Sequence, residues 1–162
     1  MPSDTLTILE LEPVTHAEAC DAIIRGLPDW FGVPEGIDEC ALAVRTSHGL
    51  VATDAGDVVG FLTDERRSAS VWEITWMAVR ADRRGSGIGS HLVAGLIAQM
   101  PGDSRLLTVK TLSDRDGDPG PEYRATRAFY LARGFLPAAE LDLWGRGNPC
   151  QLLARPLDAE PA

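Results

Sequence analysis

The most informative segment of the sequence is Arg83-Arg84-Gly85-Ser86-Gly87-Ile88-Gly89-Ser90-His91-Leu92. It follows an apolar run, Val71 to Val79, that predicts a β-strand, and it opens a pattern with a helical period. The predicted helix has one apolar face, formed by Ile88, Leu92, Val93, Leu96, Ile97 and Met100. Glycines and two arginines therefore stand where a strand turns into a helix. The first N–H groups of a helix lack an intrahelical partner and carry the positive end of its dipole. Such a turn suits a phosphate or pyrophosphate.

The glycine spacing discriminates between the anions that such a turn can bind. A dinucleotide fingerprint requires G-x-G-x-x-G and an acidic residue about 20 positions further on. This chain has G-x-G-x-G from Gly85 to Gly89, and its next acidic residue, Asp103, lies closer. A P-loop requires a lysine that is missing here. The remaining spacing, Arg84-x-x-Gly87-x-Gly89, resembles the acyl-CoA signature of the GCN5-related N-acetyltransferase (GNAT) family. Taken alone, the turn also fits a purely structural role.

Residues 125–135 carry a second part of the resemblance. The segment Ala125-Thr126-Arg127-Ala128-Phe129-Tyr130-Leu131-Ala132-Arg133-Gly134-Phe135 is similar to the family's A-x-x-F/L-Y-x-x-x-G-F pattern. The resemblance implies that Tyr130 stands beside the sulfur of CoA and protonates the departing thiolate. Seven residues earlier, where the family often has asparagine, the chain has Tyr123. The contact that this asparagine makes to CoA is therefore in doubt here. Alone, a Phe-Tyr pair on a helix is more often part of the core, and the glycine-rich turn about forty residues upstream reverses that preference.

The strand Val71 to Val79 is the third match. The resemblance implies that Met77, Ala78 and Val79 offer backbone groups to the pantetheine arm and the thioester carbonyl. Some family members carry a glutamate base six residues before the final apolar residue, and Glu73 occupies that position. Strand alternation places Glu73, Thr75, Met77 and Val79 on one face, if no bulge intervenes. The alternative is a glutamate that points outward beside a tryptophan.

Composition limits the class of protein. A chain of 162 residues is long enough for one domain, and we expect a single domain with a core over about residues 5–156 and a short disordered tail. The net charge of −9 argues against general binding to nucleic acid or to an anionic membrane. No apolar run reaches the roughly 20 residues of a membrane span, and no signal peptide is apparent. Three widely spaced cysteines predict buried thiols in a reduced, cytoplasmic protein, and three lone histidines give no reason to expect a metal.

Apolar periodicity and chain breakers predict the order β-α-α-β-β-β-α-β-α-β-β. Strands are expected at 6–12, 50–53, 58–63, 71–79, 106–112, 139–144 and 151–155, and helices at 15–27, 34–46, 88–100 and 121–133. A capping box, Thr15 to Glu18, opens the first helix. Three strands in succession predict a mixed, mostly antiparallel sheet flanked by helices, which matches the acyl-CoA N-acyltransferase fold. Between the first two helices, Trp30-Phe31-Gly32 forms either a lid over the acceptor or a staple for the helices.

The chemistry of acetyl transfer explains these residue types. An amine attacks a thioester only as the neutral base, yet a lysine-like ammonium has a pKa of about 10.4. A carboxylate such as Glu73, directly or through water, can take that proton. A backbone N–H can stabilise the oxyanion of the tetrahedral intermediate. The resemblance thus implies an enzyme that moves an acetyl group from acetyl-CoA to a primary amine of a small molecule or peptide, by direct attack in a ternary complex.

The predicted site is therefore specific. Its cofactor-binding residues are Met77, Ala78, Val79, Arg84, Gly85, Ser86, Gly87, Ile88, Gly89 and Ser90, and its catalytic residues are Tyr130 and Glu73. One alternative is an acyl-CoA-binding or regulatory domain without turnover, and another is a nucleotide-binding module that uses the same turn. The closing strands of this fold often pair with a second subunit, so a homodimer and a monomer both stay open.

Overall fold

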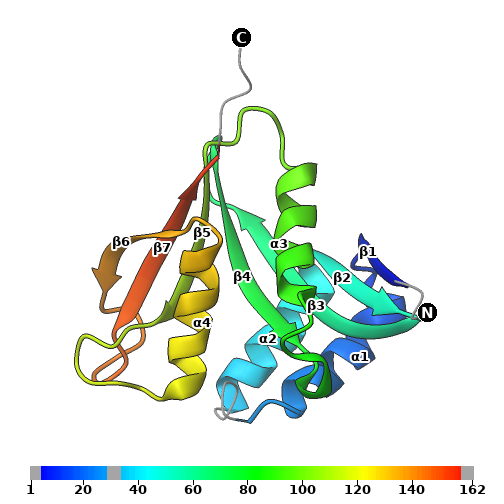
Figure 1. Ribbon diagram of the computed structural model, residues 1–162, viewed down its shortest axis with the longest axis horizontal. Coiled ribbons are helices and arrows are strands. Elements are labelled where there is room, and N and C mark those ends of the chain that lie inside the picture. Colours follow the sequence, from blue (N-terminus) through cyan, green and yellow to red (C-terminus); the bar gives the residue numbers. More distant parts are fainter. Residues whose placement is uncertain (1–4, 29–33, 158–162) are drawn as a thin grey trace. The chain divides into compact units, whose positions relative to one another are not determined.

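The computed structural model describes residues 5–28 and 34–157, and it confirms the expected order of elements. These are β1 (Leu6–Glu10), α1 (Pro13–Arg25), α2 (Pro34–Thr46), β2 (His48–Asp54), β3 (Asp57–Arg66), β4 (Val71–Val79), the 3-10 turn η1 (Ala81–Arg83), α3 (Ile88–Gln99), β5 (Leu106–Leu112), α4 (Pro121–Ala132), β6 (Leu136–Leu141) and β7 (Cys150–Pro156). The strands hydrogen-bond in the order β1-β2-β3-β4-β5-β7-β6 (Figure 1). β4 and β5 are parallel, whereas β1–β2, β2–β3, β5–β7 and β6–β7 are antiparallel. The expected mixed sheet with flanking helices is confirmed.

Two of the expected features lie outside the described residues. These are the aromatic turn Trp30-Phe31-Gly32 and the tail beyond residue 157. Within the described part of the chain, no helix combines the length and the apolar character that crossing a membrane requires.

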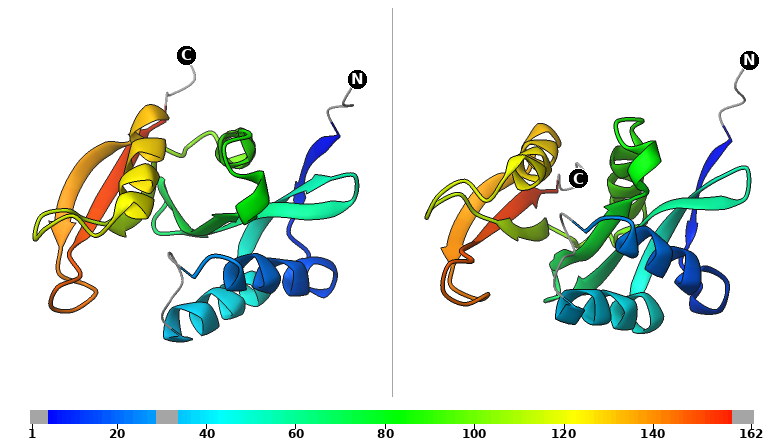
Figure 2. Two further views of the ribbon diagram at one scale, coloured as in Figure 1. Left: turned by 60° about the horizontal axis from the view of Figure 1, so that its bottom comes forward. Right: turned by 90° about the horizontal axis from the view of Figure 1, so that it is seen from below.

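The chain divides into two compact units. The first unit comprises residues 1–65 and 75–100, and the second unit comprises residues 66–74 and 101–162. In the first unit, α1 and α2 cover one face of the strands and α3 covers the other (Figure 2). In the second unit, α4 packs against β5 (Figure 2). The glycine-rich segment and the segment around Tyr130 therefore belong to different units.

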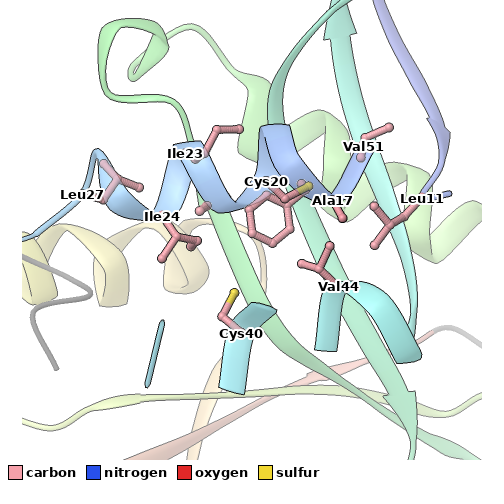
Figure 3. Close-up of a cluster of buried hydrophobic side chains, with 11 residues drawn as sticks. Leu11, Ala17, Cys20, Ile23, Ile24, Leu27, Cys40, Val44 and Val51 are labelled. Atoms are coloured by element: carbon pink, nitrogen blue, oxygen red, sulfur yellow. The ribbon is translucent and has the colours of Figure 1, made fainter. Parts of the chain in front are cut away.

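The core of the first unit holds α1 and α2 against the sheet. One face of α1 is buried through Cys20, Ile23 and Ile24, and Leu27, just after the helix, is buried beside them (Figure 3). They pack with Cys40 and Val44 of α2 and with Val51, Phe61 and Ala78 of the strands. Burying one such side chain is worth about 1.5–3 kcal/mol. All three cysteines are free and buried, which agrees with the expected packing role of the thiols.

The first helix begins earlier than its predicted capping box. α1 starts at Pro13, and its N-cap is Glu12, which makes no side-chain capping bond. Proline fixes a helical φ at the first position of a helix, so it outcompetes the cap predicted at Thr15. Instead, the N–H of Glu12 donates to Nδ1 of His16, at 3.0 Å. The imidazole thus accepts a bond from one of the N–H groups that a helix start leaves open.

Several strand boundaries also differ from the prediction, most of all at the β2–β3 turn and at β6. The loop between β2 and β3 has two residues rather than four, because Asp54 and Asp57 pair across the ladder. Ala55 and Gly56 both have positive φ, of 51° and 89°, as the tightest hairpin turns require. β6 begins at Leu136 and ends at Leu141. Trp144, which was expected to be the last residue of this strand, therefore lies outside it. Its register is fixed by β7, where Leu141 faces Cys150.

A histidine joins three neighbouring strands of the first unit. Nδ1 of His48, on β2, lies 2.7 Å from Asp64 of β3, and Nε2 lies 2.9 Å from Glu10 of β1. Asp64 is only 2% exposed, and its other oxygen has no partner among the described residues. Burial lowers the pKa of His48, but the hydrogen bond and charge of Asp64, followed by those of Glu10, outweigh it, so the pKa is raised. The imidazole of His48 therefore gives the buried carboxylate of Asp64 a hydrogen-bond partner of opposite charge when it is protonated.

Replacing His48 with Leu should destabilise the protein by about 1–3 kcal/mol, because the buried Asp64 carboxylate loses its partner. A group with a raised folded pKa stabilises fully below its unfolded value, here 6.5, and loses that contribution as the pH rises through the folded pKa. The wild-type free energy of unfolding in urea should therefore fall from pH 6 to pH 9 more steeply than that of His48→Leu. Glu10→Gln, which changes the exposed partner, is the matched control and should cost less. Parallel pH curves for wild type and His48→Leu would contradict this assignment.

Candidate functional site

The glycine-rich turn joins the 3-10 turn η1 to α3. The helix begins at Ile88, as predicted, and its N-cap is Gly87 in a left-handed conformation with φ of 84°. A side chain disfavours this conformation, which explains the glycine. The first intrahelical bond runs from the N–H of His91 to the carbonyl of Gly87, at 3.1 Å. The amides of Ile88 and Gly89 stand before it in the first turn, where the helix offers them no acceptor. The turn thus presents the amides and the dipole that bind an anion.

Close packing fixes where this helix begins. Ile88 is 2% exposed, and a Cβ added at Gly60 of β3 would meet Cγ2 of Ile88 at 2.9 Å and the carbonyl oxygen of Ala78 at 3.3 Å. Only a residue without a side chain fits between the first turn of α3 and β4. The N–H of Arg80 donates to the carbonyl of Val59 at 2.9 Å, which ties the end of β4 to β3. The glycine-rich turn is therefore set on a closely packed part of the first unit.

Most polar side chains next to the turn already have partners. Arg83 forms an ion pair with Asp54 at 2.7 Å, and Arg80 forms one with Asp82 at 2.6 Å. The hydroxyl of Ser86 donates to the carbonyl of Arg83 at 2.5 Å, so it braces the turn from within. Arg84, the arginine of the predicted signature, is exposed. Nδ1 of His91 lies 2.8 Å from the carbonyl of Gly87, a contact not predicted above, although a histidine four residues after the N-cap is a local signal for it.

The alternation of β4 is interrupted before Met77. The hydroxyls of Thr75 and Thr63 lie 2.7 Å apart, and Thr63 shares a face of β3 with Phe61. Ala78 belongs to the buried cluster that contains Phe61 under α1 and α2, and Trp76 packs against that cluster. Thr75 and Trp76 are consecutive and yet face the same side, so a local irregularity shifts the alternation there. The prediction that Glu73, Thr75, Met77 and Val79 share one face applies only to a strand without a bulge, so it does not extend to Met77 and Val79.

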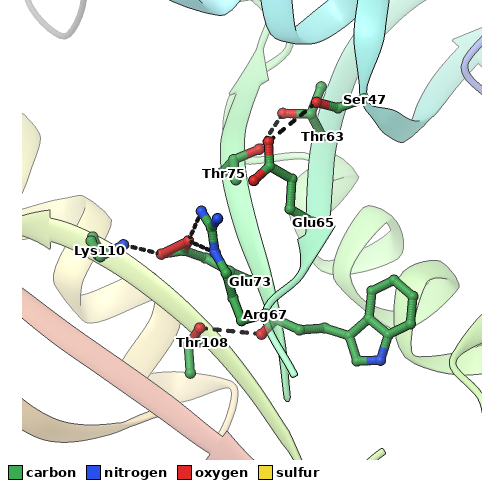
Figure 4. Close-up of polar contacts among 9 residues, drawn as sticks. Ser47, Thr63, Glu65, Arg67, Glu73, Thr75, Thr108 and Lys110 are labelled. Atoms are coloured by element: carbon green, nitrogen blue, oxygen red, sulfur yellow. Dashed lines mark hydrogen bonds and ion pairs between the residues drawn. The ribbon is translucent and has the colours of Figure 1, made fainter. Parts of the chain in front are cut away.

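The Glu73 side chain is buried between two cationic side chains rather than pointing outward. It is 4% exposed, and Nε of Arg67 lies 2.7 Å from one of its oxygens (Figure 4). Nη2 of Arg67 contacts the same oxygen, and Nζ of Lys110 lies 2.5 Å from the other. Lys110 is the only lysine of the chain. Both oxygens thus have cationic partners, which sequence analysis missed because one of them lies 37 residues further along the chain. The outward-pointing alternative is wrong.

Tyr130 is held at the end of α4 by a closed turn. The N–H of Phe135 donates to the carbonyl of Tyr130 at 3.1 Å, and the N–H of Gly134 donates to that of Leu131 at 3.2 Å. With Gly134 at φ of 86°, this is a Schellman motif, and it confirms the predicted helix stop at Gly134. The tyrosine ring makes edge contacts to Phe129 and Phe135, with centroids 5.0 and 5.2 Å away. Burial raises its pKa, so the phenol keeps its proton throughout the neutral range.

The predicted site residues fall into two groups. Met77 to Val79 and residues 84–90 belong to the first unit, where the packing around Gly60 brings the end of β4 and the start of α3 together. Glu73 and Tyr130 belong to the second unit. There, Glu73 contacts Arg67 and Lys110, whereas Tyr130 contacts Phe129 and Phe135. Among the described residues, no cluster of His, Cys, Asp or Glu has the arrangement of a metal site.

Solved structures share this fold at low sequence identity. A GNAT-family protein from Desulfovibrio desulfuricans superposes with a TM-score of 0.79 at 21% identity, over 96% of this chain and 99% of that one. An aminoglycoside 6′-N-acetyltransferase in complex with coenzyme A gives 0.74 at 18% identity, over 96% and 99% of the two chains. A GNAT-family acetyltransferase from Elizabethkingia anophelis with acetyl-CoA bound gives 0.66 at 17% identity, over 96% and 100%. Among proteins of curated function, none matches the sequence.

A match to a family model identifies the family of this chain. The model of the acetyltransferase (GNAT) domain matches residues 45–137, which is more than half of the chain. The matched range begins at the end of α2 and contains the glycine-rich turn, all of α4 and Tyr130. Because this match covers more than half of the chain, and the fold agrees, the chain belongs to the GNAT acetyltransferase family.

Proposed function

We propose that this protein transfers an acetyl group from acetyl-CoA to the primary amine of a small molecule or peptide. The single observation that carries the proposal is the turn at residues 84–90. Its backbone amides lie at the N-terminus of α3, where they have no intrahelical acceptor, and it falls within the matched GNAT domain. The structural neighbours with coenzyme A or acetyl-CoA bound support the choice of ligand. The proposal takes residues 5–156 as one N-acetyltransferase domain.

The residues of the turn fit a diphosphate. Neither Gly85 nor Gly87 has a Cβ to hold the backbone away from an anion, and both have positive φ, of 77° and 84°. Arg84, Ser86, Ile88, Gly89 and Ser90 complete the binding segment. Met77, Ala78 and Val79 are proposed to bind the pantetheine arm through their backbone. Bound acetyl-CoA supplies the thioester, whose carbonyl carbon the amine attacks.

Two side chains are proposed to handle protons. Glu73 takes the proton from the attacking ammonium, directly or through a water, and its place in β4 supports the role. Tyr130 donates toward the departing sulfur, and its raised pKa keeps the donor proton in place. The reaction needs no covalent enzyme intermediate, so most of the acceleration comes from placing the two substrates together. The net charge of −9 favours a cationic acceptor.

The experiment that tests this function has two parts. Calorimetry with acetyl-CoA measures binding, and release of free CoA is then followed with spermidine, kanamycin, free lysine and a peptide with an open N-terminus. Turnover with any of these amines supports the proposal. Tight binding of acetyl-CoA without turnover on the whole panel favours the non-catalytic acyl-CoA-binding alternative. If NAD or ATP raises the thermal midpoint and acetyl-CoA does not, the nucleotide-binding alternative is correct.

The proposed base leads to a prediction for Glu73→Gln. Turnover at pH 7 should fall by about 10²- to 10⁴-fold, because general-base catalysis contributes by that amount. Activity should recover as the pH rises toward the pKa of the acceptor amine, which then loses its proton without help. The pH–rate profile of the variant measures this recovery. The double variant Glu73→Gln with Lys110→Met restores the charge balance around the site and serves as the control. If both variants keep the wild-type profile and only unfold more easily, Glu73 is a structural counter-ion of Arg67 and Lys110.

A further inference from the structure

The phenol of Tyr130 is not anchored by its own hydroxyl. Among the described residues, none forms a hydrogen bond with that oxygen, and the ring is 4% exposed. Its position therefore depends on the edge contacts with Phe129 and Phe135 and on the placement of α4. A group proposed to donate to a departing sulfur must be placed accurately, because a shift of about 1 Å can cost 10²-fold in rate. Whatever holds α4 in place thus also positions the phenol.

Arg127 joins α4 to the sheet of the second unit through a side-chain hydrogen bond. It stands three residues before Tyr130, so the two side chains lie on neighbouring positions of one helix face. Its guanidinium is buried, with the residue 8% exposed, and Nη1 donates to the carbonyl of Leu112 at 2.9 Å. Leu112 is the last residue of β5 and is paired with Cys150 of β7. The arginine thus connects the middle of the helix to a fixed strand end.

The surroundings of Arg127 do not favour a purely stabilising role. Its nearest carboxylate is that of Asp114, at 3.6 Å, and the Asp114 side chain is 65% exposed. Burying a guanidinium removes it from water, and here it gains only one hydrogen bond to a carbonyl and a distant carboxylate. The cost of desolvation therefore offsets most of the free energy that these two contacts contribute. Arg124, one turn earlier on the same helix, is 65% exposed and pairs with Asp118. It makes an ordinary surface ion pair and offers a matched comparison.

We propose that Arg127 is a positioning residue for Tyr130: it holds α4 at the carboxyl end of β5 and so fixes where the phenol stands during acetyl transfer. The inference rests on the proposed function, since it assigns a role in the same reaction. It predicts that the effect of changing Arg127 passes through Tyr130 rather than adding to it.

A double-mutant cycle tests this coupling. Wild type, Arg127→Met, Tyr130→Phe and the double variant are assayed with acetyl-CoA and the best amine of the panel of spermidine, kanamycin, lysine and an N-terminal peptide. Arg127→Met should lower kcat by about 10- to 100-fold and leave KM for acetyl-CoA unchanged. The double variant should be no slower than Tyr130→Phe alone, because a phenol that is absent cannot be misplaced. Arg124→Met is the matched control and should keep wild-type kcat. Two effects that multiply in the double variant would overturn the inference.

A second readout separates this inference from the proposed function. The chain has two tyrosines, so protein labelled with 3-fluorotyrosine gives two ¹⁹F resonances, and Tyr130→Phe identifies the one from Tyr130. This resonance should shift and broaden in Arg127→Met and stay unchanged in Arg124→Met. An unchanged resonance in Arg127→Met overturns the positioning role. If Arg127→Met does not fold, the cycle and the spectra use Arg127→Lys, which keeps one donor and should give an intermediate loss. If wild type turns over no amine of the panel, the proposed function fails and the spectra alone decide on Arg127.

Discussion

Gly87→Asp is expected to abolish acetyl-CoA binding in a chain that still folds. The backbone at Gly87 has φ of 84°, a conformation that Asp tolerates better than most residues, at a cost of about 1–2 kcal/mol. A Cβ there would meet only the His91 ring, at 3.8 Å, which is ordinary contact. The new carboxylate sits at the N-terminus of α3, where a negative charge favours the helix but repels a diphosphate. Because a like-charge contact costs several kcal/mol, Kd should rise by at least about 100-fold.

The matched control for this variant is Gly147→Asp. Gly147 also has φ of 84°, and a Cβ added there would meet no heavy atom within 4 Å. The change therefore adds the same charge and similar backbone strain elsewhere in the chain. Calorimetry with acetyl-CoA should give the wild-type Kd for this control, and circular dichroism should show that both variants fold. Equal Kd values for the two variants would place the diphosphate somewhere other than residues 84–90.

Tyr130→Phe should reduce turnover by about 10- to 1000-fold and leave acetyl-CoA affinity unchanged. Burial raises the pKa of this phenol above its usual value of 10.0, whereas a thiol such as that of cysteine has a pKa of about 8.5. Full proton transfer to the thiolate is therefore uphill, and the phenol acts mainly by donating a hydrogen bond as the carbon–sulfur bond breaks. Phenylalanine keeps the ring between Phe129 and Phe135, so the variant removes only the donor.

Two measurements check the role of this phenol. Steady-state assays on Tyr130→Phe should show the loss in kcat, while Tyr123→Phe removes the other phenol of the chain and should keep kcat. The raised pKa also means that the donor stays protonated as the pH rises to 10, so wild-type activity should show no decline below that pH from this group. If Tyr130→Phe turns over at the wild-type rate, the residue has no part in the mechanism.

The elements that could be predicted from the sequence are those with local signals. Gly134 marks the end of α4, and the strand of residues 71–79 and the helix start at Ile88 lie where apolar periodicity places them. The predicted start of α1 is wrong because two local signals compete there, and the proline at position 13 fixes φ before the capping box at Thr15 can act. The predicted turn at residues 54–57 is too long, because the pairing of Asp54 with Asp57 depends on contact between the two strands.

The parts of the site that could not be predicted depend on contacts between distant residues. Glu73 is identified by its position in β4, but its ion pairs come from Arg67 and Lys110, and no local pattern connects these residues. The shift of side-chain alternation at Thr75 can be recognised only from the contacts of Thr75 with Thr63 and of Trp76 with the buried core. The turn at residues 84–90 is predictable because glycines mark it directly. The glycine that allows α3 to approach, Gly60, is not, because it stands 28 residues earlier than Ile88.

The ion pair between Lys110 and Glu73 has a consequence if the protein uses acetyl-CoA as proposed. A thioester acylates exposed side-chain amines spontaneously, and a chain rich in lysine would accumulate such damage at many places. This chain has one lysine, and a buried carboxylate holds its ammonium at 2.5 Å. Arginine supplies the remaining positive side chains, and guanidinium groups resist acylation because they stay charged at any physiological pH. The positive side chains of this protein are therefore almost all arginines, which a thioester does not acylate.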